Sequence, residues 1–219
     1  NQRLAAMGEM AASLAHQLRT PLAAALLYAA NLGQPGMADE ARARFSEKAT
    51  GQLRRLERLI QDVLLFARGE SIGRDVIPAG DLLLEAAQTV EPLMREHGIA
   101  FAAVDHCEGA ILVGGRKALF GALINLLENA MQATPAGGKI CLTGNRRGDW
   151  VAVSVSDNGP GVDPDKKARI FEPFFTTKGQ GTGLGLAIAL GVARAHGGAI
   201  ELFSAPGQGA EFVMTLPVS

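Results

Sequence analysis

The sequence of 219 residues predicts a helical hairpin that forms a dimeric four-helix bundle, followed by a two-layer α/β sandwich. Two observations lead to this fold class. Apolar residues repeat at heptad spacing over residues 1–70, which is typical of paired helices. From about residue 76, shorter helices and strand-like alternation replace that pattern, which indicates a mixed sandwich. We therefore expect the hairpin to span residues 1–72 and the sandwich to span residues 73–219.

Both helices of the expected hairpin carry an apolar stripe. The first stripe ends at turn-forming residues around Gly33 and consists of Leu4, Met7, Ala11, Leu14, Leu18, Ala25 and Leu32. The second consists of Phe45, Leu53, Leu56, Leu59, Ile60, Val63, Leu64 and Ala67. One hairpin cannot bury both stripes, whereas two hairpins in a four-helix bundle can. We expect a homodimer; the alternative is a monomeric hairpin packed against its own second domain.

The second half alternates between helical and strand-like segments. Helices are expected near residues 82–96, 117–133 and 183–196. Strands are expected at residues 99–104, 110–113, 140–143, 151–156, 200–203 and 211–216. Strands and helices mixed in this way predict two packed layers.

Composition narrows the class of protein. The net charge of −1 argues against a general nucleic-acid or membrane-surface binder, so neither partner is expected for this stretch. The two cysteines, Cys107 and Cys141, lack metal-ligand or disulfide spacing, which favours buried free thiols and a cytoplasmic location. The chain opens inside an amphipathic pattern and without Met, so we expect it to be part of a longer protein.

One histidine of the first helix has the setting of a nucleophile. With Leu4 at heptad position a, His16 falls at the outermost position f. Thr20 lies four residues further on the same face, and Pro21 removes one backbone hydrogen bond inside the helix. An exposed, neutral imidazole is a capable nucleophile. Taken alone, however, a single surface histidine is more often only a solvated side chain.

Two segments have the chemistry of a nucleotide site. Asn125 and Asn129 share one helix face, where two amide oxygens can help to hold Mg²⁺. Asp157 ends an alternating strand and can accept a hydrogen bond from an adenine amino group, while Gly159 and Gly161 allow close approach of the backbone. In isolation, the amides are also typical of a helix surface, and Asp-Asn-Gly is an ordinary turn.

Two further segments point to the phosphates. The phenylalanines that flank Pro173, Phe171 among them, are suited to anchor a lid, from which Lys178 could reach a phosphate. Residues 179–186 are rich in glycine and open a helix, where free N–H groups and the helix dipole cradle phosphate. The segment is not a Walker A loop, because it lacks the Gly-Lys-Ser/Thr order.

The segment Ser13-Leu14-Ala15-His16-Gln17-Leu18-Arg19-Thr20-Pro21-Leu22 resembles the H-box of sensor histidine kinases, in which the histidine is phosphorylated. The family usually has Glu or Asp where this sequence has Gln17. The four later segments resemble the N, G1, F and G2 boxes of the same family, in the family order. The resemblance implies the Bergerat (GHKL) fold and an ATP and Mg²⁺ site, which includes Asn125, Asn129, Gln132, Asp157, Gly159, Gly161, Phe171, Lys178, Gly181, Thr182, Gly183, Leu184 and Gly185.

The resemblance also implies the reaction. ATP would phosphorylate His16, with Gln17 and Thr20 as the other catalytic residues, and the phosphoryl group would pass to an Asp of a response regulator. Thr20 stands where family members position a water for dephosphorylating the regulator. Met7-Gly8-Glu9-Met10-Ala11 looks like the NtrB-like branch, and the H-box region looks like sensor kinases of flagellar gene control, which act on an NtrC-type activator.

Two other functions fit parts of the pattern. An ATP-driven conformational machine of the gyrase or Hsp90 kind would share the nucleotide boxes, but it needs no H-box. A nucleotide-binding scaffold, or a phosphatase with weak kinase activity, would keep the whole pattern, and Gln17 is the feature that favours it.

Overall fold

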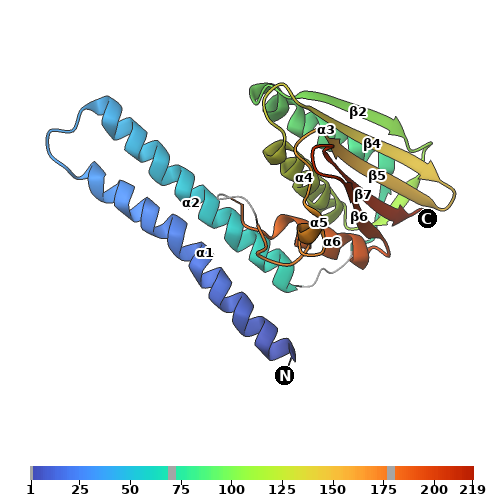
Figure 1. Cartoon of the computed structure of the whole chain (residues 1–219), viewed down its shortest axis with the longest axis horizontal. Helices are drawn as coiled ribbons and strands as arrows, with labels where there is room; N and C mark the ends of the chain where they lie inside the picture. Colours follow the sequence, from blue (N-terminus) through green and yellow to red (C-terminus); the bar gives the residue numbers. More distant parts are fainter. Residues whose placement is uncertain (1, 69–72, 177–180) are drawn as a thin grey trace. The chain divides into compact units, whose positions relative to one another are not determined.

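The computed structural model describes residues 2–68, 73–176 and 181–219 (Figure 1). The chain divides into two compact units. The first comprises the residues up to Ala67 together with Thr176–Thr182, and the second comprises Arg68–Phe175 and Gly183–Ser219. The domain boundary expected between residues 72 and 73 adjoins residues 69–72, which lie outside the described part, so that boundary stays a prediction.

The first unit is the expected hairpin of two long helices, α1 (Gln2–Leu32) and α2 (Asp39–Arg68). Near the turn, the rings of Tyr28 and Phe45 lie 6.1 Å apart, and Lys48 Nζ lies 5.7 Å from the Tyr28 ring centre. Several large apolar side chains remain exposed: Leu22, Leu26, Leu27, Leu53 and Ile60. Leu53 and Ile60 belong to the expected stripe of α2, whereas Leu22, Leu26 and Leu27 lie outside the expected stripe of α1, of which Ala25 is buried. A single hairpin therefore leaves apolar side chains of both helices uncovered.

The second unit is built on a five-stranded sheet in the order β2-β4-β5-β7-β6. The strands are β2 (Ala100–His106), β4 (Lys139–Arg147), β5 (Trp150–Asp157), β6 (Ala199–Ser204) and β7 (Ala210–Pro217). β2 runs parallel to β4, and all other neighbours are antiparallel. A separate antiparallel pair is formed by β1 (Asp75–Pro78) and β3 (Ile111–Gly114), of which β1 was not expected from the sequence.

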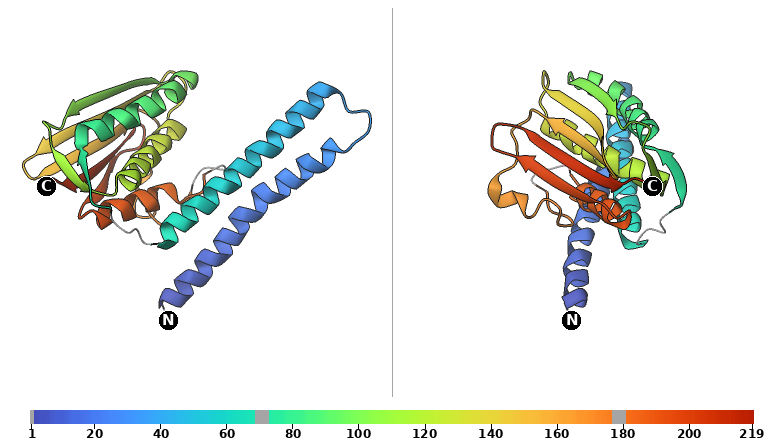
Figure 2. Two further views of the ribbon diagram at one scale, coloured as in Figure 1. Left: turned by 180° about the vertical axis from the view of Figure 1, so that it is seen from behind. Right: turned by 90° about the vertical axis from the view of Figure 1, so that its right-hand side faces the viewer.

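Three helices cover one face of this sheet, as two views of the ribbon show (Figure 2). They are α3 (Ala79–Glu96), α4 (Arg116–Ala133) and α6 (Gly185–Ala195). The core between the layers is aliphatic, and its fully buried side chains include Leu119, Leu123, Leu126, Leu127, Leu142 and Phe212. The predicted two-layer α/β sandwich is thus confirmed, and the structure adds the one-turn helix α5 (Pro164–Lys167).

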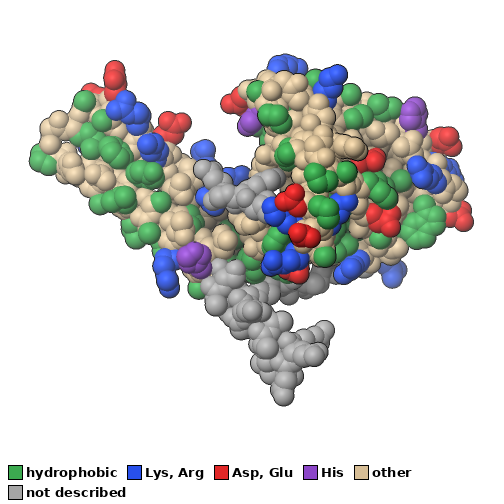
Figure 3. Space-filling view, viewed as in Figure 1, with side chains coloured by type: hydrophobic (Ala, Val, Ile, Leu, Met, Phe, Trp, Pro, Cys, Tyr) green, Lys and Arg blue, Asp and Glu red, His purple; other side chains and the backbone are tan. Residues whose placement is uncertain are grey.

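The expectation of two buried free thiols holds for Cys107 but not for Cys141. Cys107 is a buried free thiol, whereas Cys141 is free but only half-buried, because it lies on the sheet face that the helices leave open. On the face seen in Figure 3, basic and acidic side chains of the described residues are interspersed. Among the helices as far as they are described, none combines the length and apolarity needed to cross a bilayer.

Each unit contains one fluorescent aromatic residue of its own. The single tyrosine of the sequence, Tyr28, lies in the hairpin, and the single tryptophan, Trp150, begins β5 in the sandwich. The Trp150 side chain is 45 % exposed, at the turn between β4 and β5.

Candidate functional site

His16 lies on the exposed surface of α1, about halfway along the helix. The Thr20 hydroxyl donates a hydrogen bond to the main-chain oxygen of His16, at 3.3 Å. Pro21 is buried and has no N–H group, so it cannot bond the carbonyl of Gln17 four residues earlier, as a helical residue normally does. The Gln17 side chain is half-buried. The helix therefore presents the imidazole to solvent, beside a locally altered backbone.

Helix α4 carries the three predicted polar residues of the N-box segment. Asn125 and Asn129 are half-buried and Gln132 is exposed. The Asn125 Nδ2 group donates a hydrogen bond to the main-chain oxygen of Gly185, at 3.2 Å. This bond fixes the orientation of the amide and joins the middle of α4 to the first residue of α6.

Asp157 ends β5 and is 6 % exposed. Its Oδ1 accepts a hydrogen bond from the N–H group of Gly159, at 2.9 Å. A Cβ atom on Gly159 would stand 2.7 Å from the main-chain oxygen of Ala133, so the loop passes directly over the end of α4. From Asn125 to Ala133 the helix rises about 12 Å, at ~1.5 Å per residue. The same helix thus brings the Asp157 loop and the Gly185 end of α6 into one region.

Two glycines hold the Asp157 loop in a conformation that other residues do not easily adopt. Gly161 has a φ of +76°, and a Cβ there would lie 2.2 Å from the main-chain oxygen of Ala205. Gly209 also has a φ of +76°, and its Cβ would lie 2.0 Å from the main-chain oxygen of Asp157. The loop after Asp157 and the turn before β7 therefore pack backbone to backbone, which requires glycine at both positions.

The F-box segment is anchored at Phe171 and at Phe174. The rings of Phe171 and Phe212 meet edge to face, at 6.2 Å and 85°. Phe174 adopts a φ of 65°, uncommon for a large side chain, and its N–H group donates to the main-chain oxygen of Gly183, at 2.9 Å. Gly183 itself has a φ of +70°, and a Cβ there would lie 2.5 Å from the Phe174 carbonyl carbon.

The remaining predicted residues fall near the start of α6. Leu184 is fully buried at the N-cap position of the helix, where its side chain makes no capping hydrogen bond, while Gly181 and Thr182 are half-buried. Lys178 lies outside the described residues. Of the thirteen predicted nucleotide residues, the structure therefore joins Asn125 to Gly185 directly, and it joins Asp157 to Gly159.

Sequence reasoning missed several residues that hold this region in place. Asn158 Oδ1 accepts a hydrogen bond from the N–H group of Lys139, at 2.7 Å, and so ties the Asp157 loop to the start of β4. Asp75 and His196 contact the beginning of α4. No local pattern signals these contacts, because the partners are far apart in sequence.

The residues present fit ATP with Mg²⁺. In the described part of the chain, no group of three or more His, Cys, Asp and Glu side chains could hold a metal ion by itself. Mg²⁺ does not require such a group, because it is usually held by a few protein oxygens together with phosphates and water. The amide oxygens of Asn125 and Asn129 suit that role, and the crowded backbone at Gly159 has no space for a side chain beside Asp157.

Comparison with known proteins shows the same two parts. Residues 6–72 match the family described as the His Kinase A (phospho-acceptor) domain. Residues 114–219 match the family described as Histidine kinase-, DNA gyrase B-, and HSP90-like ATPase. The chain is 43 % identical to the sensor protein kinase FleS of Pseudomonas aeruginosa, over 100 % of this chain and 54 % of FleS. It thus spans about half the length of that relative.

Solved structures give the same result. Histidine kinase ThkA, in complex with the response regulator protein TrrA, matches 100 % of this chain and 64 % of its own, with a TM-score of 0.84 and 28 % identity. Full-length ShkA, in complex with AMPPNP, matches 96 % of this chain and 46 % of its own, with a TM-score of 0.72 and 34 % identity. Together with the exposed His16 and the residues gathered around α4, these matches show that the chain belongs to the histidine kinase family.

Proposed function

We propose that this chain binds Mg·ATP in its second unit, transfers the γ-phosphoryl group to His16 and passes it on to an aspartate of a response regulator. The observation that carries the proposal is the arrangement around α4, where Asn125 meets Gly185 and Asp157 meets Gly159. An exposed histidine in a phospho-acceptor domain provides the matching nucleophile.

The proposed transfer has a simple electron balance. A lone pair of the His16 imidazole forms a bond to the γ-phosphorus, and the bond from that phosphorus to the bridging oxygen breaks, so ADP leaves with the electron pair. The imidazole N–H proton passes to water, because the amide of Gln17 cannot act as a base. Mg²⁺, when bound, neutralises charge on the phosphates.

The other residues have supporting roles in this proposal. Asp157 accepts a hydrogen bond from the adenine amino group. Asn125 and Asn129 offer oxygens to the metal, with Gln132 on the same helix. Phe171 anchors one end of the lid. Lys178, Gly181, Thr182, Gly183, Leu184 and Gly185 form the phosphate loop, with N–H groups at the start of α6 directed to the phosphates.

The proposed partners are supported by the exposed apolar side chains of the hairpin and by the similar proteins. The uncovered leucines of the hairpin, such as Leu26 at 62 % and Leu27 at 63 %, support a homodimer whose second hairpin buries them. The ThkA complex supports a response regulator as the acceptor. The resemblance of the H-box region to sensor kinases of flagellar gene control supports an NtrC-type activator as its identity, and the chain is similar to the sensor protein kinase FleS. The two free thiols support a cytoplasmic location.

Incubation with γ-labelled ATP tests the reaction. The chain should gain label that is lost in acid and retained in alkali, as expected of phosphohistidine. His16→Ala should gain none and yet bind ATP as the unchanged chain does. Labelling of this variant at the original rate would contradict the proposal. His97→Ala is the matched control, because His97 is another exposed histidine, and it should label normally.

Gln17 favours a second candidate, a phosphatase or nucleotide-binding scaffold with weak kinase activity. The residue beside His16 cannot accept a proton, whereas the Thr20 hydroxyl, which family members use in dephosphorylation, is one turn away. A chain that binds ATP, stays almost unlabelled and removes phosphate from a phosphorylated regulator would support this candidate.

A further inference from the structure

Helix α4 begins without a capping side chain of its own. Its N-cap is Gly115, with a φ of −83° and a ψ of 101°, and no side chain caps the helix from that position. The first N–H groups of a helix have no partner within it, so they need acceptors from elsewhere. Two such acceptors come from distant parts of the chain: His196 Nε2 accepts the Gly115 N–H at 2.9 Å, and Asp75 Oδ2 accepts the Arg116 N–H at 3.1 Å.

The two partners of His196 fix which of its ring nitrogens donates and which accepts. The ring is 8 % exposed and follows the end of α6. Its Nδ1 lies 2.7 Å from the main-chain oxygen of Val192, and since a carbonyl only accepts, Nδ1 carries the proton. Nε2 is then the acceptor for Gly115. The Cδ2–Nε2 edge of the ring also lies against Gly114, where a Cβ would stand 2.1 Å from His196 Cδ2.

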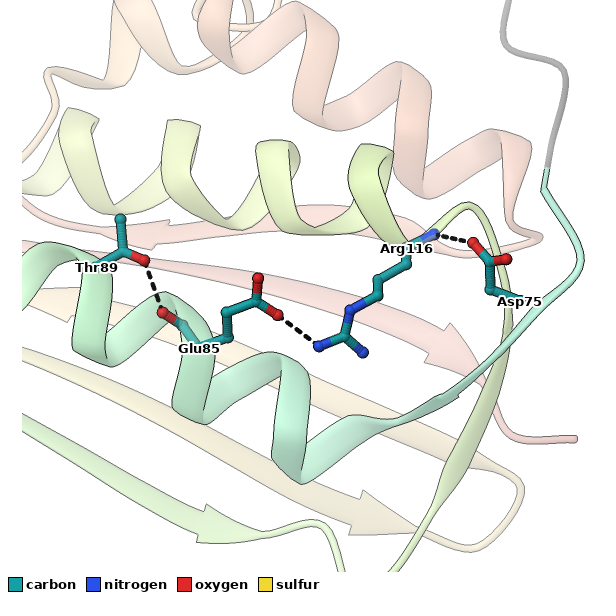
Figure 4. A network of polar contacts seen from close by, with 4 residues as sticks. All are labelled: Asp75, Glu85, Thr89 and Arg116. Atoms are coloured by element: carbon teal, nitrogen blue, oxygen red, sulfur yellow. Dashed lines mark hydrogen bonds and ion pairs between the residues drawn. The ribbon is translucent and has the colours of Figure 1, made fainter.

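Asp75, the first residue of β1, contacts the start of α4 as His196 does. It lies opposite Gly114 in the β1–β3 pair, and a Cβ on Gly73 would stand 3.0 Å from Gly115 Cα. Figure 4 shows the Asp75 carboxylate at the backbone of Arg116, whose guanidinium pairs with Glu85 of α3. A carboxylate at this end of a helix is also favoured by the helix dipole.

Helices α4 and α6 are consequently tied at two points. At one end of α6, Gly185 accepts from Asn125, and at the other end His196 accepts from Gly115. Two hydrogen bonds at separate points prevent one helix from sliding along the other, whereas a single hydrogen bond would leave the helix free to pivot.

We propose that His196 and Asp75 are positioning residues for the nucleotide site. His196 holds the end of α6 to the start of α4, and Asp75 fixes the same start of α4 from β1, so that Asn125 meets Gly185 and Asn129 lies one turn further along the same helix face, although neither His196 nor Asp75 touches nucleotide. This inference rests on the proposed nucleotide site. It adds that the site depends on a contact at the opposite end of α6.

The test measures Mg·ATP affinity of the whole chain by calorimetry, with thermal unfolding as the check on folding. His196→Leu and Asp75→Ala should each weaken binding, by roughly tenfold for His196→Leu and less for the exposed Asp75, since a lost helix-cap bond has effects of this order. His97→Leu is the matched control: His97 Nδ1 also lies 2.7 Å from the carbonyl four residues earlier, at the end of α3. It should leave the affinity unchanged.

Conservative variants separate positioning from general loss of stability. His196→Gln keeps an oxygen that can accept from Gly115, so it should recover most of the affinity lost in His196→Leu even where both variants unfold earlier. Gly115→Ser adds a local cap, and there is space for it, since the nearest atom to a Cβ at Gly115 is 3.4 Å away. Combined with Asp75→Ala, it should restore binding.

The outcomes distinguish this inference from the proposed function. Unchanged ATP affinity in both His196→Leu and Asp75→Ala, in a chain that binds ATP and labels His16, would overturn the inference alone. If His196→Leu does not fold, the Asp75→Ala and Gly115→Ser pair decides: failure of Gly115→Ser to restore binding would overturn the inference. A chain without ATP binding or label would instead overturn the proposed function.

Discussion

Asn125 Nδ2 donates a hydrogen bond to the main-chain oxygen of Gly185, at 3.2 Å, and so fixes which end of the amide faces away from α6. Asn125→Asp should therefore weaken Mg·ATP binding, by roughly tenfold, although a carboxylate is a good magnesium ligand. The reason is that a carboxylate cannot donate to the Gly185 carbonyl and is repelled by it. Calorimetry measures the change, with Asn145→Asp, a half-buried asparagine on β4, as the control.

Asp157→Asn should weaken adenine recognition more than phosphate binding. The amide can still accept the Gly159 N–H through its oxygen, so the loop should keep its shape, whereas the charge that strengthens a bond to an adenine amino group is lost. We expect the preference for ATP over GTP to fall, as measured by competition binding. An unchanged preference would show that Asp157 does not contact the base.

Gln17→Glu should speed autophosphorylation. A carboxylate beside the phosphoacceptor can take the imidazole proton and stabilise growing positive charge, whereas an amide can only orient the ring. A positioned general base is worth about 10²–10⁴-fold, and a gain toward the lower end is expected because orientation is already present. The rate is measured at saturating ATP, and ATP affinity should stay the same. An equal or lower rate would mean that proton removal does not limit the reaction.

Cys107 should make stability depend on pH in the alkaline range. Burial raises the pKa of the Cys107 thiol to about 12, from 9.0, and the neighbouring Asp105 carboxylate adds to the rise. The folded pKa is above the unfolded one, so the stabilising effect is complete below about pH 9 and is lost as the pH rises toward 12.

Urea unfolding at about pH 8 and about pH 10 measures this dependence. Cys107→Ala should unfold with a smaller loss of free energy between the two pH values than the unchanged chain does. Cys141→Ala serves as the control, because Cys141 is only half-buried, and it should keep the original dependence. An identical dependence in both variants would show that other groups cause it.

The sequence predicted most of the fold because long periodic segments dominate it. Both hairpin helices and the α4 segment carry apolar residues at helical spacing, and β5 has a valine at every second position from Val151 to Val155. β1 was missed because it has only four residues, and its partner β3 is distant in sequence. β4 continues beyond residue 143, where the sequence predicted its end, because Gly144 is part of the strand and not of a turn. Gly144 is needed there for close packing, since a Cβ would stand 2.5 Å from Cys107 Sγ.

The residues of the candidate site could be predicted from the sequence, but the residues that hold them in place could not. Asn125, Asp157 and the glycines stand in recognisable local strings, and each string has a chemical reason. The acceptors at the start of α4 could not be read in this way. Asp75 and His196 come close to Gly115 only after β1, α4 and α6 have packed. A glycine at the N-cap position does not indicate which residues accept the first N–H groups of the helix.

The single tyrosine and the single tryptophan lie in different units, so the chain has two intrinsic fluorescence channels, one for each unit. Trp150 reports on the sandwich, and Tyr28, beside Phe45, reports on the hairpin. Selective excitation of the tryptophan therefore follows unfolding of one unit without any label, and the tyrosine signal follows the other. Coincident transitions in the two channels would mean that the units unfold together, and separate transitions would give each unit a stability of its own.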